Sequence, residues 1–271
     1  MTGRLEGQVA VVTGGGRGFG RWIARGLAAE GAAVVVTSRT ASELERTVEL
    51  IEDAGGRAMR VVGDVTRLED MQEVRARAEK SFGTVTLAVH NAGVPWPFGP
   101  TWYVDPARWW TAQSVHVLGA LHCVRTFVPA MIDHGGGRVI VVSSRGGTRL
   151  SPNMSGYGVA KGTQIRLVEF LAVEAKEHGV AAFSIHPGSE LTGISDLTMD
   201  DPDAQRYVPW FVQRLSGRKG TNEDPTAGFE ACAELCVKLG SGKFDRLTGR
   251  FLTPDDDLDA LEPLPEPEAR G

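Results

Sequence analysis

Short runs of apolar residues alternate along this chain with longer segments of helical periodicity, and this alternation limits the possible folds most strongly. The apolar runs are continuous rather than alternating, which indicates strands that are buried on both faces. Such strands require a parallel sheet with helices packed on each side. We therefore expect a doubly wound α/β fold. The predicted strands are residues 9–12, 34–36, 58–62, 85–90, 138–142, 180–185 and 250–252.

The segments between these strands define the rest of the domain. The predicted helices are residues 23–29, 41–54, 67–81, 106–132, 155–177 and 225–239. Residues 189–220 are polar, weakly periodic and interrupted by prolines, so we predict a mobile segment that covers the substrate. Residues 255–271 are acidic and contain three prolines, which predicts an extended or disordered tail. Residues 1–254 should form one domain, because 42% hydrophobic residues suit a continuous core.

Composition excludes several classes of partner. A net charge of −5 argues against a nucleic acid or an anionic membrane, since both require a basic face. No run approaches the roughly 18 to 20 apolar residues of a membrane span, and the first eight residues form no apolar segment. Cys123, Cys232 and Cys236 cannot all pair and lie in expected helices. We expect free thiols in a cytoplasmic protein that acts on a small molecule.

A glycine-rich turn joins the first predicted strand to the first predicted helix. Gly14, Gly18 and Gly20 stand in this turn together with Arg17 and Phe19. Backbone N–H groups and the helix dipole at such a position favour a pyrophosphate, and glycine allows it to approach the backbone. A glycine cluster alone is equally compatible with a plain tight turn. Its place in the first strand–turn–helix unit predicts a dinucleotide site and a Rossmann-type sheet of about seven strands.

The glycine spacing resembles that of the short-chain dehydrogenase/reductase family, and further motifs over about residues 7–252 agree. The matching residues are Asp64 and Val65 after the third strand, Asn91, Ala92 and Gly93 after the fourth, Ser144, Tyr157 and Lys161, and Pro187, Gly188 and Thr192. The resemblance implies that Ser144, Tyr157 and Lys161 are catalytic. It also implies that the other matched residues, together with Tyr157 and Lys161, bind the cofactor, with Asp64 at the adenine amine.

The catalytic motif suits carbonyl reduction, which needs an acid beside the substrate oxygen. Tyr157 can be this acid, and Lys161 follows it by one helical turn on the same face. Its ammonium and an oxidised nicotinamide would lower the pKa of Tyr157 from about 10 by roughly 2 to 3 units. Lys161 would also bind the nicotinamide ribose, and Ser144 would orient the substrate oxygen. We predict an oxidoreductase that interconverts a ketone and a secondary alcohol.

The end of the second strand should decide between NAD and NADP, which differ by a phosphate on the adenosine ribose. Members of the family that bind NAD usually have an acid where Ser38 stands. Arg39 and Arg17 match two basic positions seen in members that use NADP. Arginine suits a phosphate because its donors are planar and bidentate. We predict NADP(H) as cofactor; the alternative is that both arginines are solvated surface charges.

The long predicted helix departs from the family at His116. The resemblance implies an asparagine here that supports a water connected to the catalytic lysine. His116 could bind this water and, with an ordinary pKa near 6.5, add a titrating step to a proton relay. The alternative is a packing substitution, and both interpretations stay open. The other histidines show no metal-ligand spacing, so we predict no metal.

Further departures lie near the expected substrate. Arg145 follows Ser144, and Glu190 replaces the usual apolar residue of its loop; they either face the substrate or form a salt bridge with each other, which we favour. Aromatic residues, Trp96 and Trp210 among them, cluster in the two segments that should converge at the carboxyl edge of the sheet. They predict a pocket for a bulky or aromatic carbonyl substrate, although aromatic residues also suit subunit contacts.

The sequence also suggests an oligomeric state and leaves two alternative functions open. The resemblance implies a homodimer or homotetramer formed through the two long helices, residues 106–132 and 155–177. One alternative function is a nucleotide-binding redox sensor without turnover, which the presence of Ser144, Tyr157 and Lys161 disfavours. The other is a non-redox enzyme of the same fold that catalyses dehydration, epimerisation or ring opening. His116 and Glu190, as additional acid or base groups, give that alternative slight support.

Overall fold

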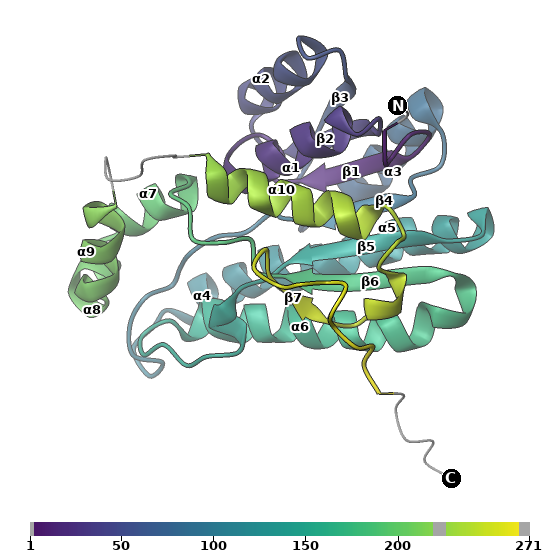
Figure 1. Ribbon diagram of the computed structural model, residues 1–271. Helices are drawn as coiled ribbons and strands as arrows, with labels where there is room; N and C mark the ends of the chain where they lie inside the picture. Colours follow the sequence, from purple (N-terminus) through teal and green to yellow (C-terminus); the bar gives the residue numbers. More distant parts are fainter. Residues whose placement is uncertain (1–2, 219–225, 266–271) are drawn as a thin grey trace.

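The computed structural model describes residues 3–218 and 226–265, which are built around a parallel sheet (Figure 1). Its strands are β1 (Val9–Thr13), β2 (Ala33–Ser38), β3 (Arg57–Val62), β4 (Leu87–His90), β5 (Gly137–Val142), β6 (Val180–Ile185) and β7 (Phe251–Leu252). The spatial order of the seven strands is β3-β2-β1-β4-β5-β6-β7. The order reverses between β1 and β4, and the crevice at such a reversal is where these sheets bind ligands. The predicted fold class is confirmed.

Helices cover both faces of the sheet. The helices are α1 (Gly18–Ala29), α2 (Ala41–Glu52), α3 (Leu68–Phe82), α4 (Pro106–Gln113), α5 (Gly119–His134), α6 (Ser155–Ala175), α7 (Gly193–Met199), α8 (Pro202–Tyr207), α9 (Pro209–Gly217) and α10 (Ala227–Gly240). Buried residues of α1, α2 and α10 form one core layer, and those of α3, α5 and α6 form the other. Figure 1 shows α1 and α10 side by side on the first of these faces.

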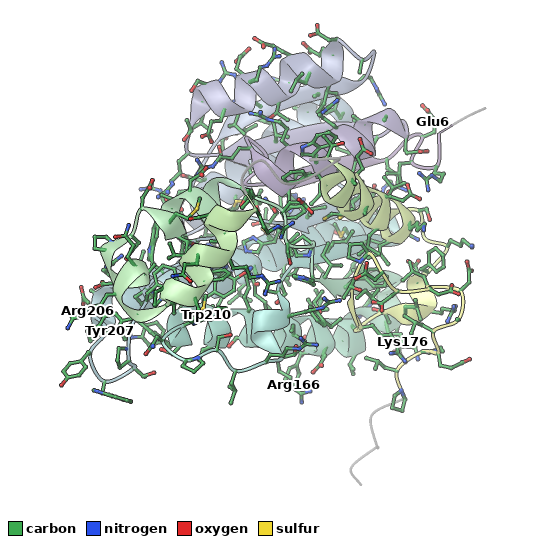
Figure 2. All side chains as sticks on the ribbon, turned by 60° about the vertical axis from the view of Figure 1, so that its left-hand side comes forward. Glu6, Arg166, Lys176, Arg206, Tyr207 and Trp210 are labelled. Atoms are coloured by element: carbon green, nitrogen blue, oxygen red, sulfur yellow. The ribbon has the colours of Figure 1, made fainter. Side chains whose placement is uncertain are left out.

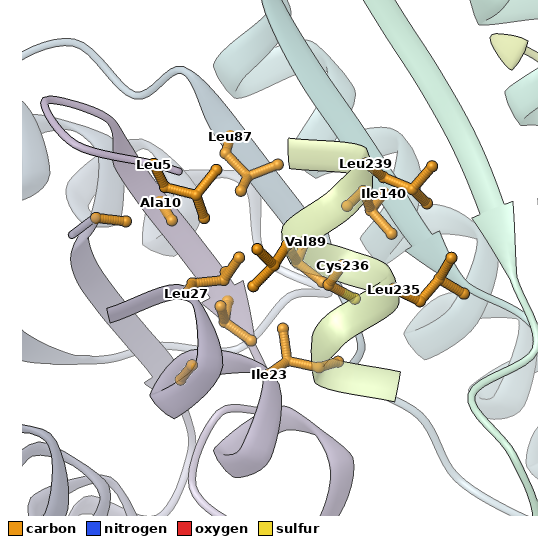
Figure 3. Close-up of a cluster of buried hydrophobic side chains, with 14 of the residues drawn as sticks. Leu5, Ala10, Ile23, Leu27, Leu87, Val89, Ile140, Leu235, Cys236 and Leu239 are labelled. Carbon is orange, nitrogen blue, oxygen red and sulfur yellow. The ribbon is translucent and has the colours of Figure 1, made fainter. Parts of the chain in front are cut away.

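Alternate residues of each strand face opposite layers, as the pleat of a strand requires. In β1, Ala10 points into the layer with α1 and α10, whereas Val11 points toward α3 and α5. Figure 3 shows Ile23 and Leu27 of α1 in the same apolar cluster as Cys236 of α10. This two-sided burial explains why the strands appear in the sequence as uninterrupted apolar runs. The three cysteines are buried and free of disulfides.

The prediction of one unbroken helix over residues 106–132 is wrong in one respect, because the helix changes its hydrogen-bond pattern part-way along. A π-helical turn, Ser114–Leu118, separates α4 from α5. Apolar periodicity does not resolve a single widened turn, which is why the sequence predicted an unbroken helix. The whole run Pro106–His134 is long and apolar enough to cross a membrane, and half of its most apolar window is buried inside the domain. Such burial is that of a core helix.

The segment predicted to cover the substrate contains three short helices, α7, α8 and α9, which its weak periodicity did not indicate. Its described residues, 189–218, are called the cover below. Asp201 caps the N-terminus of α8 and pairs with Arg108 of α4 at 3.1 Å. The side chain of Asn153 donates to the carbonyl of Tyr207 at 2.9 Å, and Val208 is fully buried in a small apolar cluster. These contacts fasten the cover to the domain. Residues 219–220 of the predicted segment and Pro225 of the next lie outside the described residues.

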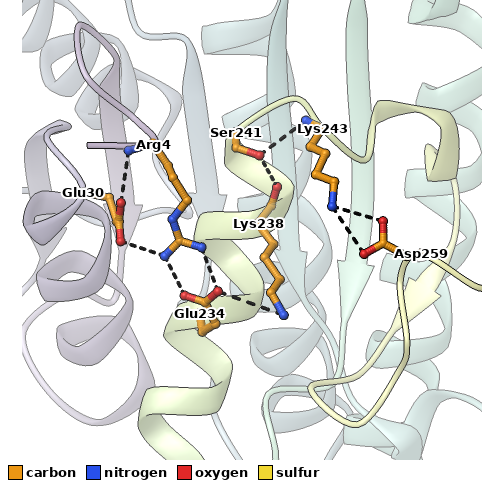
Figure 4. Close-up of polar contacts among 7 residues, drawn as sticks. All are labelled: Arg4, Glu30, Glu234, Lys238, Ser241, Lys243 and Asp259. Atoms are coloured by element: carbon orange, nitrogen blue, oxygen red, sulfur yellow. Dashed lines mark hydrogen bonds and ion pairs between the residues drawn. The ribbon is translucent and has the colours of Figure 1, made fainter. Parts of the chain in front are cut away.

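The predicted acidic tail lacks regular structure and is largely exposed over residues 255–265, in agreement with an extended tail, but a few contacts anchor it to the domain. Leu258 is 4% exposed, and the guanidinium of Arg246 donates to the carbonyl of Leu258 at 2.7 Å. Lys243 pairs with Asp259 at 3.0 Å (Figure 4). The leucines interspersed among the acids provide this anchorage. Residues 266–271 of the predicted tail lie outside the described residues.

Figure 4 also shows how the start of the chain is fixed to the domain. Arg4 pairs with Glu30 at the end of α1 and with Glu234 of α10, at 2.7 Å in each case. Hydrogen bonds from the Arg4 guanidinium lower the pKa of both acids. The contact holds the strand–turn–helix unit that begins the sheet against the helix that closes it.

Candidate active site

The glycine turn between β1 and α1 has a shape that only glycine accommodates. Gly14 and Gly18 have φ angles of 62° and 51°, in the left-handed region. A side chain at Gly20 would place its Cβ 2.2 Å from the carbonyl oxygen of Gly14. The Asn91 amide donates to this oxygen at 3.2 Å and to the carbonyl of Thr13 at 3.1 Å. The turn is therefore held rigidly at the N-terminus of α1, where a pyrophosphate is favoured.

A groove runs from this turn along the carboxyl edge of the sheet. Its lining includes twelve of the predicted cofactor residues: Gly14, Arg17, Gly18, Phe19, Ser38, Arg39, Asp64, Val65, Asn91, Ala92, Gly93 and Thr192. Pro187, Gly188, Tyr157 and Lys161 line an adjoining pocket that shares Phe19, Asn91 and Gly93 with the groove. Gly20 closes the turn from behind and lines neither cavity. Gly14 and Gly18 line the groove at the N-terminus of α1, a position that favours the phosphates of a dinucleotide.

Two exposed arginines line the groove, Arg17 in the glycine turn and Arg39 just after β2. Arg17 is 3.5 Å from Glu43, and Arg39 is 4.0 Å from Asp64. The side chains of Arg17 and Arg39 are 53% and 74% exposed, and ion pairs of this exposure contribute little stability. Ser38 ends β2 beside them and accepts a hydrogen bond from the backbone of Thr40 at 3.3 Å. Both guanidinium groups are therefore free to turn toward a ligand phosphate.

Ser144, Tyr157 and Lys161 meet in the adjoining pocket, which has a volume of about 350 Å³. Ser144 follows β5 and caps a short turn by accepting from the N–H of Gly146 at 3.0 Å. Tyr157 and Lys161 come from successive turns of α6, and the lysine Nζ lies 5.6 Å from the centre of the tyrosine ring. The predicted group of three is thus assembled from two elements next to the cofactor groove.

The charge states of this group follow from burial. Burial raises the pKa of Tyr157 above its usual 10, and a hydrogen bond with Ser144 partly offsets the rise. The ammonium of Lys161 is directed at other acceptors than the phenol. The predicted lowering of the Tyr157 pKa also requires an oxidised nicotinamide, so it stays a prediction. Burial lowers the pKa of Lys161 to about 7. At neutral pH, Lys161 is therefore partly protonated, and Tyr157 keeps its proton.

His116 lies next to the group but in a neutral state. Its ring packs edge-on against Tyr157 with centroids 5.7 Å apart, and Nε2 lies 2.8 Å from the carbonyl oxygen of Val94. Complete burial, followed by the nearby Lys161 charge, holds the pKa of His116 well below 6.5. A ring that stays neutral favours the packing interpretation of this substitution over the titrating relay.

Two residues in or beside the pocket escaped the sequence analysis. Gln164 is buried behind Lys161 and accepts from its Nζ at 3.1 Å; its position three residues later, on the same helical face, was an available signal. His186 follows β6, directly before Pro187, and lines the pocket. Burial lowers the pKa of His186 to about 4, so it presents a neutral imidazole.

The predicted salt bridge between Arg145 and Glu190 is wrong. Glu190 pairs with Arg218 at 3.5 Å, and Arg145 pairs with Asp255 at 3.4 Å. Both predicted residues nevertheless line the pocket. Their partners come from the cover and the tail, two segments that the sequence analysis left without defined structure.

The two tryptophans predicted for the pocket separate in the structure. Trp210 begins the second half of the cover and lines the pocket; Figure 2 shows it on the cover helices near Tyr207. Trp96 does not line the pocket and packs instead with the apolar cluster of Phe98 and Val208. The assignment of Trp96 to the substrate site is therefore corrected to a support for the cover.

Comparison with known proteins agrees with this geometry. The family model for short chain dehydrogenases matches residues 8–203 of the chain. This chain belongs to the short-chain dehydrogenase/reductase family. A short chain dehydrogenase of Pseudocercospora fijiensis is 32% identical over 99% of this chain and 86% of its own length. Family membership identifies the protein as an oxidoreductase of the NAD(P)-dependent type.

Solved structures of the family show the same fold with either cofactor. A gluconate 5-dehydrogenase from Burkholderia cenocepacia, in complex with NADP and tartrate, superposes with a TM-score of 0.79, 26% identity and coverage of 95% of this chain and 97% of that one. A carveol dehydrogenase from Mycobacterium avium, in complex with NAD, superposes with a TM-score of 0.82 and 25% identity. The match covers 93% of this chain and 97% of that one. The choice of cofactor therefore varies within the family.

Proposed function

We propose that this short-chain dehydrogenase/reductase is NADP(H)-dependent and interconverts a ketone and a secondary alcohol. The observation that carries the proposal is the meeting of Ser144, Tyr157 and Lys161 in one pocket that opens onto the dinucleotide groove. An acid, a hydrogen-bond donor and a cation beside a nucleotide site are the groups that carbonyl reduction needs. NADPH would supply the hydride.

The protein groups divide the remaining work. Ser144 donates a hydrogen bond to the substrate oxygen and fixes it beside the Tyr157 hydroxyl. Tyr157 transfers its proton to that oxygen as negative charge develops there. The ammonium of Lys161 stabilises the tyrosinate left behind, and burial strengthens that interaction because the local dielectric is low. In the oxidative direction the same atoms move in reverse.

The preference for NADP rests on the end of β2. Ser38 offers a hydroxyl where an acid would favour the ribose of NAD, and Arg17 and Arg39 stand exposed on either side of the groove. Guanidinium groups bind phosphate through paired, charge-assisted hydrogen bonds. The gluconate 5-dehydrogenase in complex with NADP provides a precedent for this cofactor in the same fold.

The proposed substrate is bulky and carries an anionic group away from the carbonyl. Trp210, Phe211 and Met154 give the pocket apolar walls. Among the described residues its lining also includes four arginines, Arg145, Arg149, Arg214 and Arg218, and one carboxylate, that of Glu190. Within the described part of the chain, the ion pairs found include Arg145 and Arg218 but neither Arg149 nor Arg214. Two uncompensated cations beside the pocket of a protein with a net charge of −5 favour an acid such as a carboxylate.

Arg149→Gln and Arg214→Gln should each reduce kcat/KM for 4-acetylbenzoate about tenfold, because each removes one charge-assisted hydrogen bond. The activity toward methyl 4-acetylbenzoate should not change. Arg206→Gln is the control, since Arg206 stacks on Tyr207 outside the pocket lining. Wild-type protein that prefers the ester to the acid would contradict the anionic substrate and leave the cofactor proposal intact.

The test of the proposed function is a titration with NADPH and with NADH, followed by cofactor absorbance against a panel of bulky ketones and alcohols. We expect tighter binding of NADPH and cofactor consumption equal to product formed. Product without any change in the cofactor would support non-redox chemistry instead. Tight NADPH binding with no turnover of any panel member would support a redox sensor.

We also propose that two copies pair through α5 and α6. Apolar side chains stay exposed on and beside these helices: Leu118 directly before α5, Leu121 on α5, and Val159, Phe170 and Val173 on α6. Phe170→Glu should halve the mass measured by light scattering, because it buries a charge in the proposed contact. Trp102→Glu, on a residue 79% exposed in a loop away from these helices, is the control. An unchanged mass for Phe170→Glu would exclude this face as the interface.

A further inference from the structure

Gln164 connects the catalytic lysine to the π-helical turn. It is fully buried, and its Oε1 accepts from the Nζ of Lys161 at 3.1 Å while its Nε2 donates to the carbonyl oxygen of His116 at 2.8 Å. Because a backbone carbonyl only accepts, the amide has one orientation that satisfies both contacts. Gln164 therefore presents its oxygen, and not its nitrogen, to the ammonium.

The ammonium of Lys161 depends on few acceptors. Within the described residues its hydrogen bonds go to the carbonyl of Val142 at 2.8 Å and to Gln164, and no carboxylate pairs with it. A buried cation with neutral partners loses part of its charged population to desolvation, and each acceptor restores some of it. One of the two oxygens that stabilise the charge thus belongs to a side chain that mutation can change.

We propose that Gln164 is a positioning residue of the active site: it holds the Nζ of Lys161 in place and in its charged form, braced against the carbonyl of His116. This inference deepens the proposed function, and its effect on turnover rests on that function. It also gives the π-helical turn Ser114–Leu118 a task, since this turn supplies the carbonyl that orients the amide. Widened turns of this kind are frequent at functional sites.

Gln113 provides a matched comparison. It is also buried, at 6% exposed, and its Nε2 donates to the carbonyl of Gly156 on α6 at 2.8 Å. It joins α4 to α6, as Gln164 joins the adjacent π-helical turn to α6, but it does not contact Lys161. Replacing Gln113 by methionine therefore removes a buried hydrogen bond between α4 and α6 and leaves the acceptors of the ammonium as they are.

The experiment measures the titration of Lys161 directly in the full-length protein with ¹³C-labelled lysine. The chain has six lysines, and Lys161 is the buried one among the described lysines, so Lys161→Met assigns its Cε signal. In Gln164→Met the pKa of Lys161 should fall by about one unit, because an acceptor of the charged form is lost. In Gln164→Glu it should rise, because a carboxylate then faces the ammonium. Gln113→Met should leave it unchanged.

Turnover provides the second readout. If Lys161 must be charged, kcat/KM for reduction falls as pH rises through the pKa of Lys161. The pH midpoint of this fall should be about one pH unit lower in Gln164→Met and higher in Gln164→Glu. A Lys161 titration that does not move in either Gln164 variant, or that moves as far in Gln113→Met, overturns the proposal. Since Gln164→Glu keeps the size of the side chain, it tests the idea even where Gln164→Met fails to fold. An NMR shift without detectable turnover would contradict the proposed function but not the role of Gln164 toward Lys161.

Discussion

Tyr157→Phe is expected to lower kcat/KM for carbonyl reduction by about 10² to 10⁴, the range for loss of a general acid. Phenylalanine keeps the ring that packs edge-on against His116 at 5.7 Å, so the fold around the site should be preserved. The affinity for NADPH should change little, because the glycine turn and the β2 end lie outside the substitution. Stopped cofactor oxidation with unchanged NADPH binding, measured by fluorescence, is the expected result.

Tyr103→Phe is the control for this variant, since Tyr103 is 77% exposed and lies outside the pocket lining. Near-normal turnover by Tyr157→Phe would contradict the assigned proton donor. The ring of His116 lies 5.7 Å from that of Tyr157, and His186 also lines the pocket. Burial lowers the pKa of both imidazoles, that of His116 well below 6.5 and that of His186 to about 4, so neither has a proton to give as an acid at neutral pH. Retained activity would therefore favour a reaction that needs no protein acid at the substrate oxygen.

The parts of the site predictable from the sequence are those held by local geometry. Tyr157 and Lys161 share a helical face because of their spacing, and the left-handed angles at Gly14 and Gly18 explain why glycine stands there. Strand order follows a similar logic, because buried apolar runs separated by helices can form only a few sheets. These features depend on neighbours within a few residues or on burial alone.

The features that escaped prediction depend on contacts between distant segments. Arg145 pairs with Asp255, which is 110 residues away, and no periodicity carries that information. Trp96 packs against the apolar cluster that contains Val208, a residue of the cover more than 100 positions later in the chain, and therefore does not line the pocket. The role of Gln164 depends on a carbonyl in the π-helical turn, which an apolar pattern does not reveal. Polar partners across a fold are set by packing, and packing is a three-dimensional property.

Ser38→Asp is expected to raise the Kd for NADPH at least a hundredfold and to make NADH the better cofactor. A carboxylate at the end of β2 would face the ribose phosphate, and juxtaposed like charges cost several kcal/mol, at roughly tenfold in affinity for every 1.4 kcal/mol. The same carboxylate can accept hydrogen bonds from both hydroxyl groups of the adenosine ribose of NADH. Fluorescence titration with each cofactor measures the ratio of the two Kd values.

Ser38→Asn separates charge from size in this test, because asparagine has the shape of aspartate without its charge. The ratio of the Kd values for NADPH and NADH should stay close to that of the wild type in Ser38→Asn. Arg39→Gln should bind NADPH about tenfold more weakly and NADH as before, because one charge-assisted hydrogen bond to the phosphate is missing. If Ser38→Asp binds NADPH as tightly as the wild type does, the phosphate is not read at the end of β2. Arg17 and Arg39 would then be surface charges paired with Glu43 and Asp64, as they stand at 3.5 and 4.0 Å.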